Sequence, residues 1–295
     1  MRSICPQHWK EYRLIDCGYG EKLEKFGHYT IIRPEPQALW PPAWKNEKWN
    51  EMADVRFVRE NPQKSLSNAA PSGWAYLKKN INTHWWINYQ HGGLDLKMKL
   101  MLTGFGHVGI FPEQADNWDY IFKKIRSMQK PRILNLFAYT GGASLVASMA
   151  GGDVYHLDAI KQVVNWSGEN AASNQIKNIH WVVEDALKYL KRLAKKGEKF
   201  QGLILDPPAY GRGPTGERWV LSEGLDELVQ LCSRILAPAD AFMVFNFYSL
   251  GLSPQVGYNM VKAYFKKGNT DYGELFYPSE TGYRLPLGNF VRFER

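Results

Sequence analysis

The stretch Asp206–Tyr210 reads Asp-Pro-Pro-Ala-Tyr and brings together residue types that could do chemistry in this chain. Two prolines restrict the backbone and lack the N–H groups that would otherwise satisfy nearby carbonyls. A loop of this kind can aim a carboxylate and a carbonyl at a planar amine, while a tyrosine ring stacks on the same base. We therefore predict that Asp206, Pro207, Pro208 and Tyr210 form a catalytic loop.

Three earlier segments carry further candidate binding residues. The segment 135–142 reads Asn-Leu-Phe-Ala-Tyr-Thr-Gly-Gly, and its paired glycines allow the backbone to approach a ligand closely. Asp158 follows an apolar run and suits hydrogen bonding to a ribose diol, and Asp185 follows another and suits an adenine amino group. Each feature alone also fits an ordinary tight turn or a helix N-cap.

The elements that must position these residues alternate between strand and helix after Pro131. Strands are expected at 133–137, 153–158, 179–183, 200–206 and 241–247, with helices from Gly142 to Ala150 and at 160–174, 185–195 and 221–236. Such alternation predicts an α/β fold with a mostly parallel, Rossmann-like sheet, in which ligands bind beyond the carboxyl ends of the strands. The candidate residues all lie at such ends. The tail, 274–277 and 289–293, is expected to add an antiparallel last strand.

The first part of the chain has a different sequence pattern, which predicts a β-rich subdomain. Strands are expected at 29–33 and 84–89, and Leu94–Thr103 alternates apolar and polar residues as a strand with one buried face does. The turn 104–106 is expected to fold 107–111 back on that strand as a hairpin, and Leu39, Trp40 and Trp44 to cover a core. A helix capped by Asp116 should follow. We place the domains at 1–112 and 113–295.

The composition says less than the motifs about the class of protein. Hydrophobic residues make up 44% and charged residues 22%, which is ordinary for a folded protein, and the net charge of +8 permits a polyanionic partner without requiring one. The three cysteines include no CxxC pair, and there is no secretory signal or long apolar span. We expect a cytoplasmic protein with no membrane segment. The scattered histidines His28, His84, His91 and His107 lack ligand spacing, so no metal is expected.

The motifs NLFAYTGG, HLDAIKQVVNWSGEN, EDALKYL and LDPPAYG resemble the successive motifs of class I S-adenosylmethionine (SAM)-dependent methyltransferases. The likeness covers about residues 105–293 and is nearest to bacterial large-subunit ribosomal RNA methyltransferases of the 5-methylcytosine and 7-methylguanine type. It implies SAM as cofactor and ribosomal RNA as partner. The cofactor-binding residues that it implies are Phe111, Gln114, Phe137, Tyr139, Thr140, Gly141, Gly142, Asp158, Asp185, Ala186 and Asp206.

Two departures from that family bear on the reaction. Methylation at C5 of cytosine requires a cysteine nucleophile, yet Ala209 stands beside the two prolines and 245–249 reads Phe-Asn-Phe-Tyr-Ser. Cys232 falls inside a predicted helix and is assigned to the core. We therefore expect direct transfer to nitrogen or oxygen, with Asn246 as a second polar contact. The family's usual RNA-binding module is not evident, which leaves Arg212, Arg218 and Lys78–Lys79 as candidate phosphate contacts.

Other function classes fit the residues less well. A nicotinamide-dependent oxidoreductase should carry GxGxxG after its first strand, where this chain reads AYTGGASL. A non-catalytic RNA-binding homologue would have been free to lose the ligand-facing residues. A methyltransferase of protein or of a small molecule remains open. The favoured hypothesis is a SAM-dependent methyltransferase that acts on a nucleobase of ribosomal RNA, at nitrogen rather than carbon; the oligomeric state is left undecided.

Overall fold

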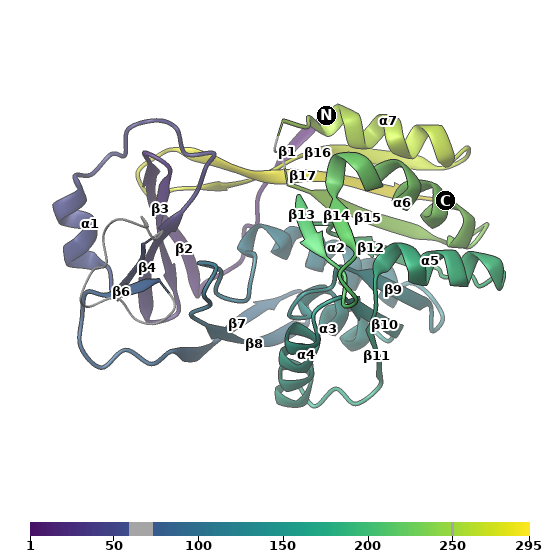
Figure 1. The fold of residues 1–295 in the computed structure, drawn as a ribbon, viewed down its shortest axis with the longest axis horizontal. Helices are drawn as coiled ribbons and strands as arrows, with labels where there is room; N and C mark the ends of the chain where they lie inside the picture. The colour runs from purple at the N-terminus through teal and green to yellow at the C-terminus, as the bar shows by residue number, and fades with distance from the viewer. Residues whose placement is uncertain (59–72, 249–250) are drawn as a thin grey trace. The chain divides into compact units, whose positions relative to one another are not determined.

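The computed structural model describes residues 1–58, 73–248 and 251–295, which fold as two compact units (Figure 1). Unit 1 comprises 1–4, 114–275 and 287–295, and unit 2 comprises 5–113 and 276–286. The chain therefore begins in unit 1, builds most of unit 2, returns to unit 1, and enters unit 2 once more at 276–286 before it ends in unit 1. The two long strands near the C-terminus contribute residues to both units.

Unit 1 contains an eight-stranded sheet in the order β1-β16-β17-β15-β12-β9-β10-β11. Neighbouring strands from β15 to β11 pair in parallel, and β17 pairs antiparallel to β15. Strand order reverses between β9 and β12, and ligands bind beside such a switch point in open α/β sheets. The strands are β1 (Arg2–Ile4), β9 (Arg132–Leu136), β10 (Asp153–Asp158), β11 (Ile179–Val183), β12 (Gly202–Leu205), β15 (Phe242–Phe247), β16 (Asn269–Pro278) and β17 (Arg284–Glu294).

Helices connect these strands. They are α2 (Ala115–Arg126), α3 (Gly142–Met149), α4 (Lys161–Ser173), α5 (Ala186–Lys195), α6 (Leu221–Ile235) and α7 (Pro254–Tyr264), with a short 3-10 turn η1 at Pro112–Gln114. The predicted α/β architecture, with its mostly parallel sheet and antiparallel last strand, is confirmed. Sequence reasoning missed β1, α7 and the short hairpin of β13 (Tyr210–Arg212) and β14 (Arg218–Val220).

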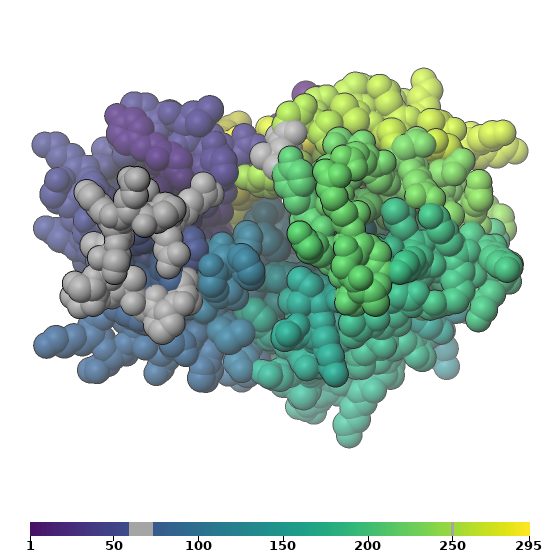
Figure 2. Space-filling model, viewed as in Figure 1, coloured from purple at the N-terminus to yellow at the C-terminus, as the bar shows by residue number. Residues whose placement is uncertain are grey.

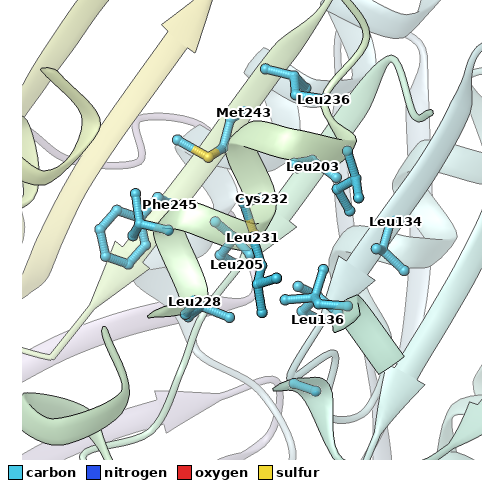
Figure 3. Packing of buried hydrophobic residues seen from close by; sticks show 14 of the residues in the cluster. Leu134, Leu136, Leu203, Leu205, Leu228, Leu231, Cys232, Leu236, Met243 and Phe245 are labelled. Carbon is cyan, nitrogen blue, oxygen red and sulfur yellow. The ribbon is translucent and has the colours of Figure 1, made fainter. Parts of the chain in front are cut away.

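The core of unit 1 explains why the central strands read as continuous apolar runs. Every residue of β12 and β15 is buried, since helices cover both faces of a parallel sheet. Leucines of β9 and β12 pack with α6, as Figure 3 shows for Leu136, Leu205 and Leu228. Gly202 is required here, because a Cβ would lie 2.5 Å from the Ile133 side chain and 2.7 Å from that of Phe242. Cys232 belongs to this core, as predicted, and its burial raises its thiol pKa.

Unit 2 is β-rich. A five-stranded sheet has the order β2-β3-β4-β5-β6, and β7 pairs antiparallel with β8. Its elements are β2 (Tyr12–Gly18), β3 (Glu21–Phe26), β4 (Tyr29–Pro34), α1 (Asn46–Met52), β5 (Val55–Phe57), β6 (Trp74–Tyr76), β7 (His84–His91) and β8 (Leu94–Met101).

Three sequence expectations outside the candidate site were wrong. The strand that pairs with β8 is β7, and 107–111 forms no strand. The turn at 104–106 does fold the chain back, since Met101 donates its backbone N–H to the Val108 carbonyl at 3.0 Å. The predicted buried face of β8 is confirmed. Leu39 does not cover a core, because 81% of its surface is exposed. Asp116 does not cap α2; Gln114 occupies the N-cap, and Asp116 lies in the first turn, where it pairs with Arg292.

Candidate active site

The sheet register aligns three strand ends of unit 1 along one edge. Leu136 of β9 lies opposite both Leu157 of β10 and Leu205 of β12. The next residue on each strand is Phe137, Asp158 or Asp206, so all three emerge at the same level. Because neighbouring strands lie about 4.8 Å apart, Asp158 and Asp206 flank the end of β9 within about 10 Å of each other.

The loop that follows β9 has an unusual backbone. Phe137, Tyr139 and Gly141 have φ angles of 55°, 49° and 94°, a region that residues other than glycine rarely adopt. Gly141 is the N-cap of α3, and an added Cβ would lie 3.2 Å from that of Ser167. Because α3 begins directly after this loop, the first N–H groups of the helix lie at this edge of the sheet, where the helix carries no acidic side chain of its own. Strain of this kind is concentrated at ligand sites.

A buried polar network lies next to this loop and fixes its path. His156 Nδ1 lies 3.0 Å from Ser144 Oγ, and its Nε2 lies 3.3 Å from Ser167 Oγ. Ser144 also accepts a hydrogen bond from Asn135, and Ser167 donates to the carbonyl of Tyr139 at 2.6 Å. Burial lowers the pKa of His156 to about 3, so the ring is neutral at physiological pH. Sequence reasoning missed this network, whose partners are far apart in the chain.

The Asp158 carboxylate lies directly beside the strained loop. One oxygen accepts the backbone N–H of Tyr139 at 2.9 Å, and the other accepts that of Ile160 at 3.0 Å. Burial raises the pKa of Asp158, against the lowering effect of these backbone donors. The Ala159 backbone also interacts with this carboxylate. A carboxylate has about four acceptor positions, so Asp158 retains capacity for a ligand. Ile160, half of whose surface is exposed, places an unexpected apolar side chain next to the carboxylate.

Asp185 caps a helix, which was one of the two roles that the sequence allowed. Its carboxylate accepts the backbone N–H of Lys188 at 2.9 Å and caps α5, while the following Ala186 is buried. The register places Val183 opposite Asp158, so Asp185 lies two residues beyond the aligned strand ends. A contact with adenine from this position stays a prediction.

Trp219 joins the loop at 206–209, which we name the acceptor loop, to Phe137 at the end of β9. Its indole N–H donates to the carbonyl of Pro208 at 2.7 Å, and its ring lies 5.1 Å from that of Phe137. The Pro208 carbonyl therefore has a partner within the chain, while Tyr210 is 72% exposed. Nothing in the spacing of the sequence pointed to Trp219, because its role depends on the unpredicted β13–β14 hairpin.

Gln114 is hydrogen-bonded to Asn246, the residue predicted as a second polar contact to the methyl acceptor. The Gln114 side-chain oxygen accepts from the amides of Asn117 and Asn246, both at 3.0 Å, and Asn117 also donates to Asn246 at 3.0 Å. Arg292 completes the cluster by donating to Asn117. Asn246 belongs to β15, one residue beyond the pairing of Phe245 with Leu205, and therefore lies level with Asp206. The remaining predicted residue, Phe111, belongs to unit 2.

The described residues hold neither a metal-binding cluster nor a helix of membrane-spanning character. No group of three or more His, Cys, Asp and Glu side chains there is arranged to hold a metal ion. Within the same ranges, no helix combines the length and apolar character that a membrane span needs. Ser249, the last residue of the cysteine-free stretch noted above, lies outside the described residues.

Comparisons with known proteins agree with this geometry. No protein-family model matches the chain. Ribosomal RNA large subunit methyltransferase I of Aeromonas salmonicida is 28% identical over 145 residues, 48% of this chain and 36% of that protein. Ribosomal RNA large subunit methyltransferase K/L of Shewanella frigidimarina is 28% identical over 146 residues, 48% of this chain and 20% of that protein. The chain thus matches about a third or less of the length of these curated relatives.

Solved structures extend the likeness over the whole chain. A protein of Streptococcus mutans described as a SAM-dependent methyltransferase has a TM-score of 0.71 at 15% identity, which shows a shared fold alone. The SAM-dependent methyltransferase of Agrobacterium tumefaciens has a TM-score of 0.89 and is 31% identical, with 100% of this chain and 93% of that chain covered. The family expected from the four motifs is confirmed by this match. On this combination of identity and coverage, the chain belongs to the SAM-dependent methyltransferases.

Proposed function

We propose that this protein transfers the methyl group of SAM to a nucleobase nitrogen of large-subunit ribosomal RNA. The observation that carries the proposal is the alignment of Asp158 and Asp206 on either side of the strained loop that follows β9. One side of this edge then suits the cofactor and the other the methyl acceptor. The chain's family and its curated relatives support the same reaction class.

The cofactor side offers matching partners for each part of SAM. Tyr139–Gly142 and the first N–H groups of α3 suit the amino-acid end, since N–H groups at a helix start attract carboxylates. Asp158 has acceptor positions left for the ribose hydroxyls, and exposed Ile160 offers apolar contact to the adenine face. Asp185 and Ala186 complete the adenine contacts in this proposal. SAM itself supplies an electrophilic methyl group on its sulfonium.

The acceptor side suits a planar amine. Asp206 and the Pro207 carbonyl accept the hydrogens of an amino or ring N–H group, which leaves its lone pair facing the methyl group. Tyr210 stacks on the base. Methyl transfer of this kind depends on positioning the reactants more than on strong base catalysis.

Nitrogen is favoured over carbon because the unit offers no suitable thiol. Methylation of cytosine C5 requires a thiolate that adds to the ring. Cys232 is the sole cysteine of unit 1; it is fully buried in the core, and its pKa is raised. A direct mechanism at nitrogen needs no such residue.

RNA is favoured as the substrate class by three observations. The curated relatives are named as ribosomal RNA methyltransferases, the chain carries a net charge of +8, and an aromatic residue and arginines follow the acceptor loop. A protein or small-molecule acceptor is the second candidate. The third, a non-catalytic RNA-binding homologue, is disfavoured because Asp158, Asp206 and the strained loop after β9, which this proposal assigns to SAM and the acceptor, are all present.

The first test is calorimetric titration of the protein with SAM and, separately, with NADH. We expect SAM to bind, and Asp158→Ala to weaken it by about 1–3 kcal/mol, the cost of a lost buried polar contact. Asp153→Ala, a partly exposed aspartate at the opposite end of the same strand, is the matched control and should bind SAM like the unchanged protein. Failure of the folded protein to bind SAM would overturn the enzyme proposal, and NADH binding would point to an oxidoreductase.

The second test identifies the acceptor. Purified protein with methyl-tritiated SAM is incubated with protein-free ribosomal RNA, and the digested nucleosides are separated. We expect label in an N-methylated nucleoside, reduced at least tenfold in Asp206→Asn. Label in 5-methylcytosine would contradict nitrogen as the target, and label in protein alone would contradict RNA.

A further inference from the structure

The β13–β14 hairpin directly follows the acceptor loop and has two different faces. Arg212 lies opposite Arg218, Gly211 opposite Trp219 and Tyr210 opposite Val220. Because side chains alternate along a strand, Trp219 points to one side while Tyr210, Arg212 and Arg218 share the other. In Figure 2 this hairpin, in mid-green, lies at the surface of unit 1.

The inner face holds the hairpin in place. Trp219 is 7% exposed, donates to Pro208 and packs on Phe137. At the tip, Glu217 accepts hydrogen bonds from Lys188 of α5 and from Thr215. A two-stranded hairpin is marginal on its own, so these contacts are what make it a defined arm beside Asp206.

The outer face has an unfavourable charge arrangement. Backbone hydrogen bonds join Gly213 to Glu217 and Leu221 to Ala209, and alternation of the ladder makes Arg212 and Arg218 a non-hydrogen-bonded pair, whose side chains stand closest. Like charges directly opposite each other destabilise a hairpin. Arg218 has one carboxylate partner, Glu223 at 3.4 Å, with 74% of the arginine side chain exposed. Arg212 is exposed and forms no ion pair with a described residue.

We propose that this outer face binds the single-stranded RNA that carries the target base, with Tyr210 stacking on that base and Arg212 and Arg218 together contacting a neighbouring phosphate. The inference rests on the proposed function for its choice of RNA. A phosphate between the two arginines removes their repulsion, and an exposed aromatic beside paired cations is the arrangement that single-strand binding uses. Tyr210 and Arg212 lie about 7 Å apart along the strand, so one stretch of nucleic acid reaches both.

Binding of fluorescein-labelled A12 RNA, followed by anisotropy at several salt concentrations, tests the inference. The variants are Tyr210→Ala, Arg212→Glu and Arg218→Glu. The control is Lys195→Glu, the same charge change at the far end of α5, where the lysine is also exposed. SAM titration of every variant shows that the fold is kept.

We expect each arginine variant to weaken A12 binding at least tenfold and to reduce the salt dependence by about one released counterion. Tyr210→Ala should weaken binding about tenfold, as loss of one stacked base does, with little change in salt dependence. Lys195→Glu should change affinity less than threefold. A 12-base-pair RNA duplex should be bound more weakly than A12.

Three results would overturn the inference: no binding of A12 by the unchanged protein, hairpin variants that bind A12 normally, or an equal loss in Lys195→Glu. If SAM binding is intact, any of these results rejects RNA binding by the hairpin but does not contradict the proposed methyltransferase activity. If the unchanged protein does not bind SAM, the proposed function is contradicted, whether or not the protein binds A12.

Discussion

Asp16 in unit 2 and Asp158 in unit 1 are both buried carboxylates, but their surroundings differ. Asp16 is fully buried and accepts hydrogen bonds from five donors, which are the backbone N–H groups of Cys17, Ala43 and Trp44, the Trp49 indole and the Thr281 hydroxyl. Asp158 is 9% exposed, and its oxygens accept one backbone N–H each from Tyr139 and Ile160.

The difference separates a structural carboxylate from one suited to a ligand. Five donors leave no unused acceptor position on Asp16, and they tie β2 to the 43–49 segment and to the turn at Thr281. Asp158 retains acceptor capacity, lies beside a strained loop and has a pKa raised by burial. Counting donors on a buried carboxylate therefore distinguishes the two roles better than burial alone.

The largest expected effect is on the structural side. Asp16→Asn keeps the shape of the side chain and removes its charge. It also turns one oxygen into an N–H donor that faces the N–H groups of Trp44 and Trp49. We expect a loss of about 3–5 kcal/mol in the free energy of unfolding, as for a broken buried charged contact. Urea unfolding followed by tryptophan fluorescence measures it. Asp95→Asn, on the exposed face of β8 in the same unit, should change stability by less than about 0.5 kcal/mol.

SAM affinity completes that test. The Asp16→Asn protein that remains folded should bind SAM as the unchanged protein does, since the mutation leaves unit 1 intact. A large drop in SAM affinity with little loss of stability would reverse the roles assigned to the two carboxylates.

The same contrast shows what could be predicted from sequence. The strands that precede Asp158, Asp185 and Asp206 followed from apolar runs and their spacing, because buried parallel strands leave a strong local pattern. The partner of β8 could not be predicted in this way. The alternation at Leu94–Leu102 defines a buried face but does not show which strand pairs with it. Contacts of His156 and Trp219 join residues distant in sequence, and no local pattern encodes them.

The neutral His156 should make the protein sensitive to acid. Its folded pKa is about 3 against about 6.5 unfolded, so between these values the unfolded chain binds the extra proton. This stability contribution is complete above pH 6.5 and falls as pH decreases, by up to about 1.4 kcal/mol per pH unit. Urea unfolding from pH 7 to pH 4 measures it.

His156→Gln provides the comparison, because it keeps hydrogen-bonding groups but does not titrate. The variant should lose stability at pH 7 and approach the unchanged protein by pH 4, so the difference between the two shrinks by about 3 kcal/mol. A difference that stays constant across this range would mean that folding does not lower the pKa of His156.

The loop beside Asp158 should respond to the loss of a glycine. Gly141→Ala places a Cβ at φ 94°, 3.2 Å from the side chain of Ser167, and should cost about 1–2 kcal/mol in stability and about tenfold in SAM affinity. Gly168→Ala is the matched control, because that helical position has open space around it. It should stabilise the protein by about 0.5–1 kcal/mol and leave SAM binding unchanged. Equal effects of the two substitutions would remove the special role given to the loop.

The smallest stability effect is expected for Asp158→Asn. One backbone N–H loses its acceptor, but the buried charge is removed as well, so the free energy of unfolding without cofactor should change by about 1 kcal/mol or less. This near-neutrality, against the large cost at Asp16, is the sharpest form of the comparison. A loss as large as that of Asp16→Asn would show that Asp158 is chiefly structural.

Cofactor binding by Asp158 should then depend on pH with the opposite sign to stability. A raised carboxyl pKa means that the folded protein holds the proton more tightly, so the group's contribution to stability is present below the unfolded pKa of about 3.8 and is lost as pH rises through the folded pKa. SAM affinity should instead rise over that interval, because the ionised carboxylate is the better acceptor for ribose hydroxyls. Titrations at decreasing pH should show affinity falling for the unchanged protein and a flatter profile for Asp158→Asn. Parallel profiles for both proteins would place the ribose contact on another residue.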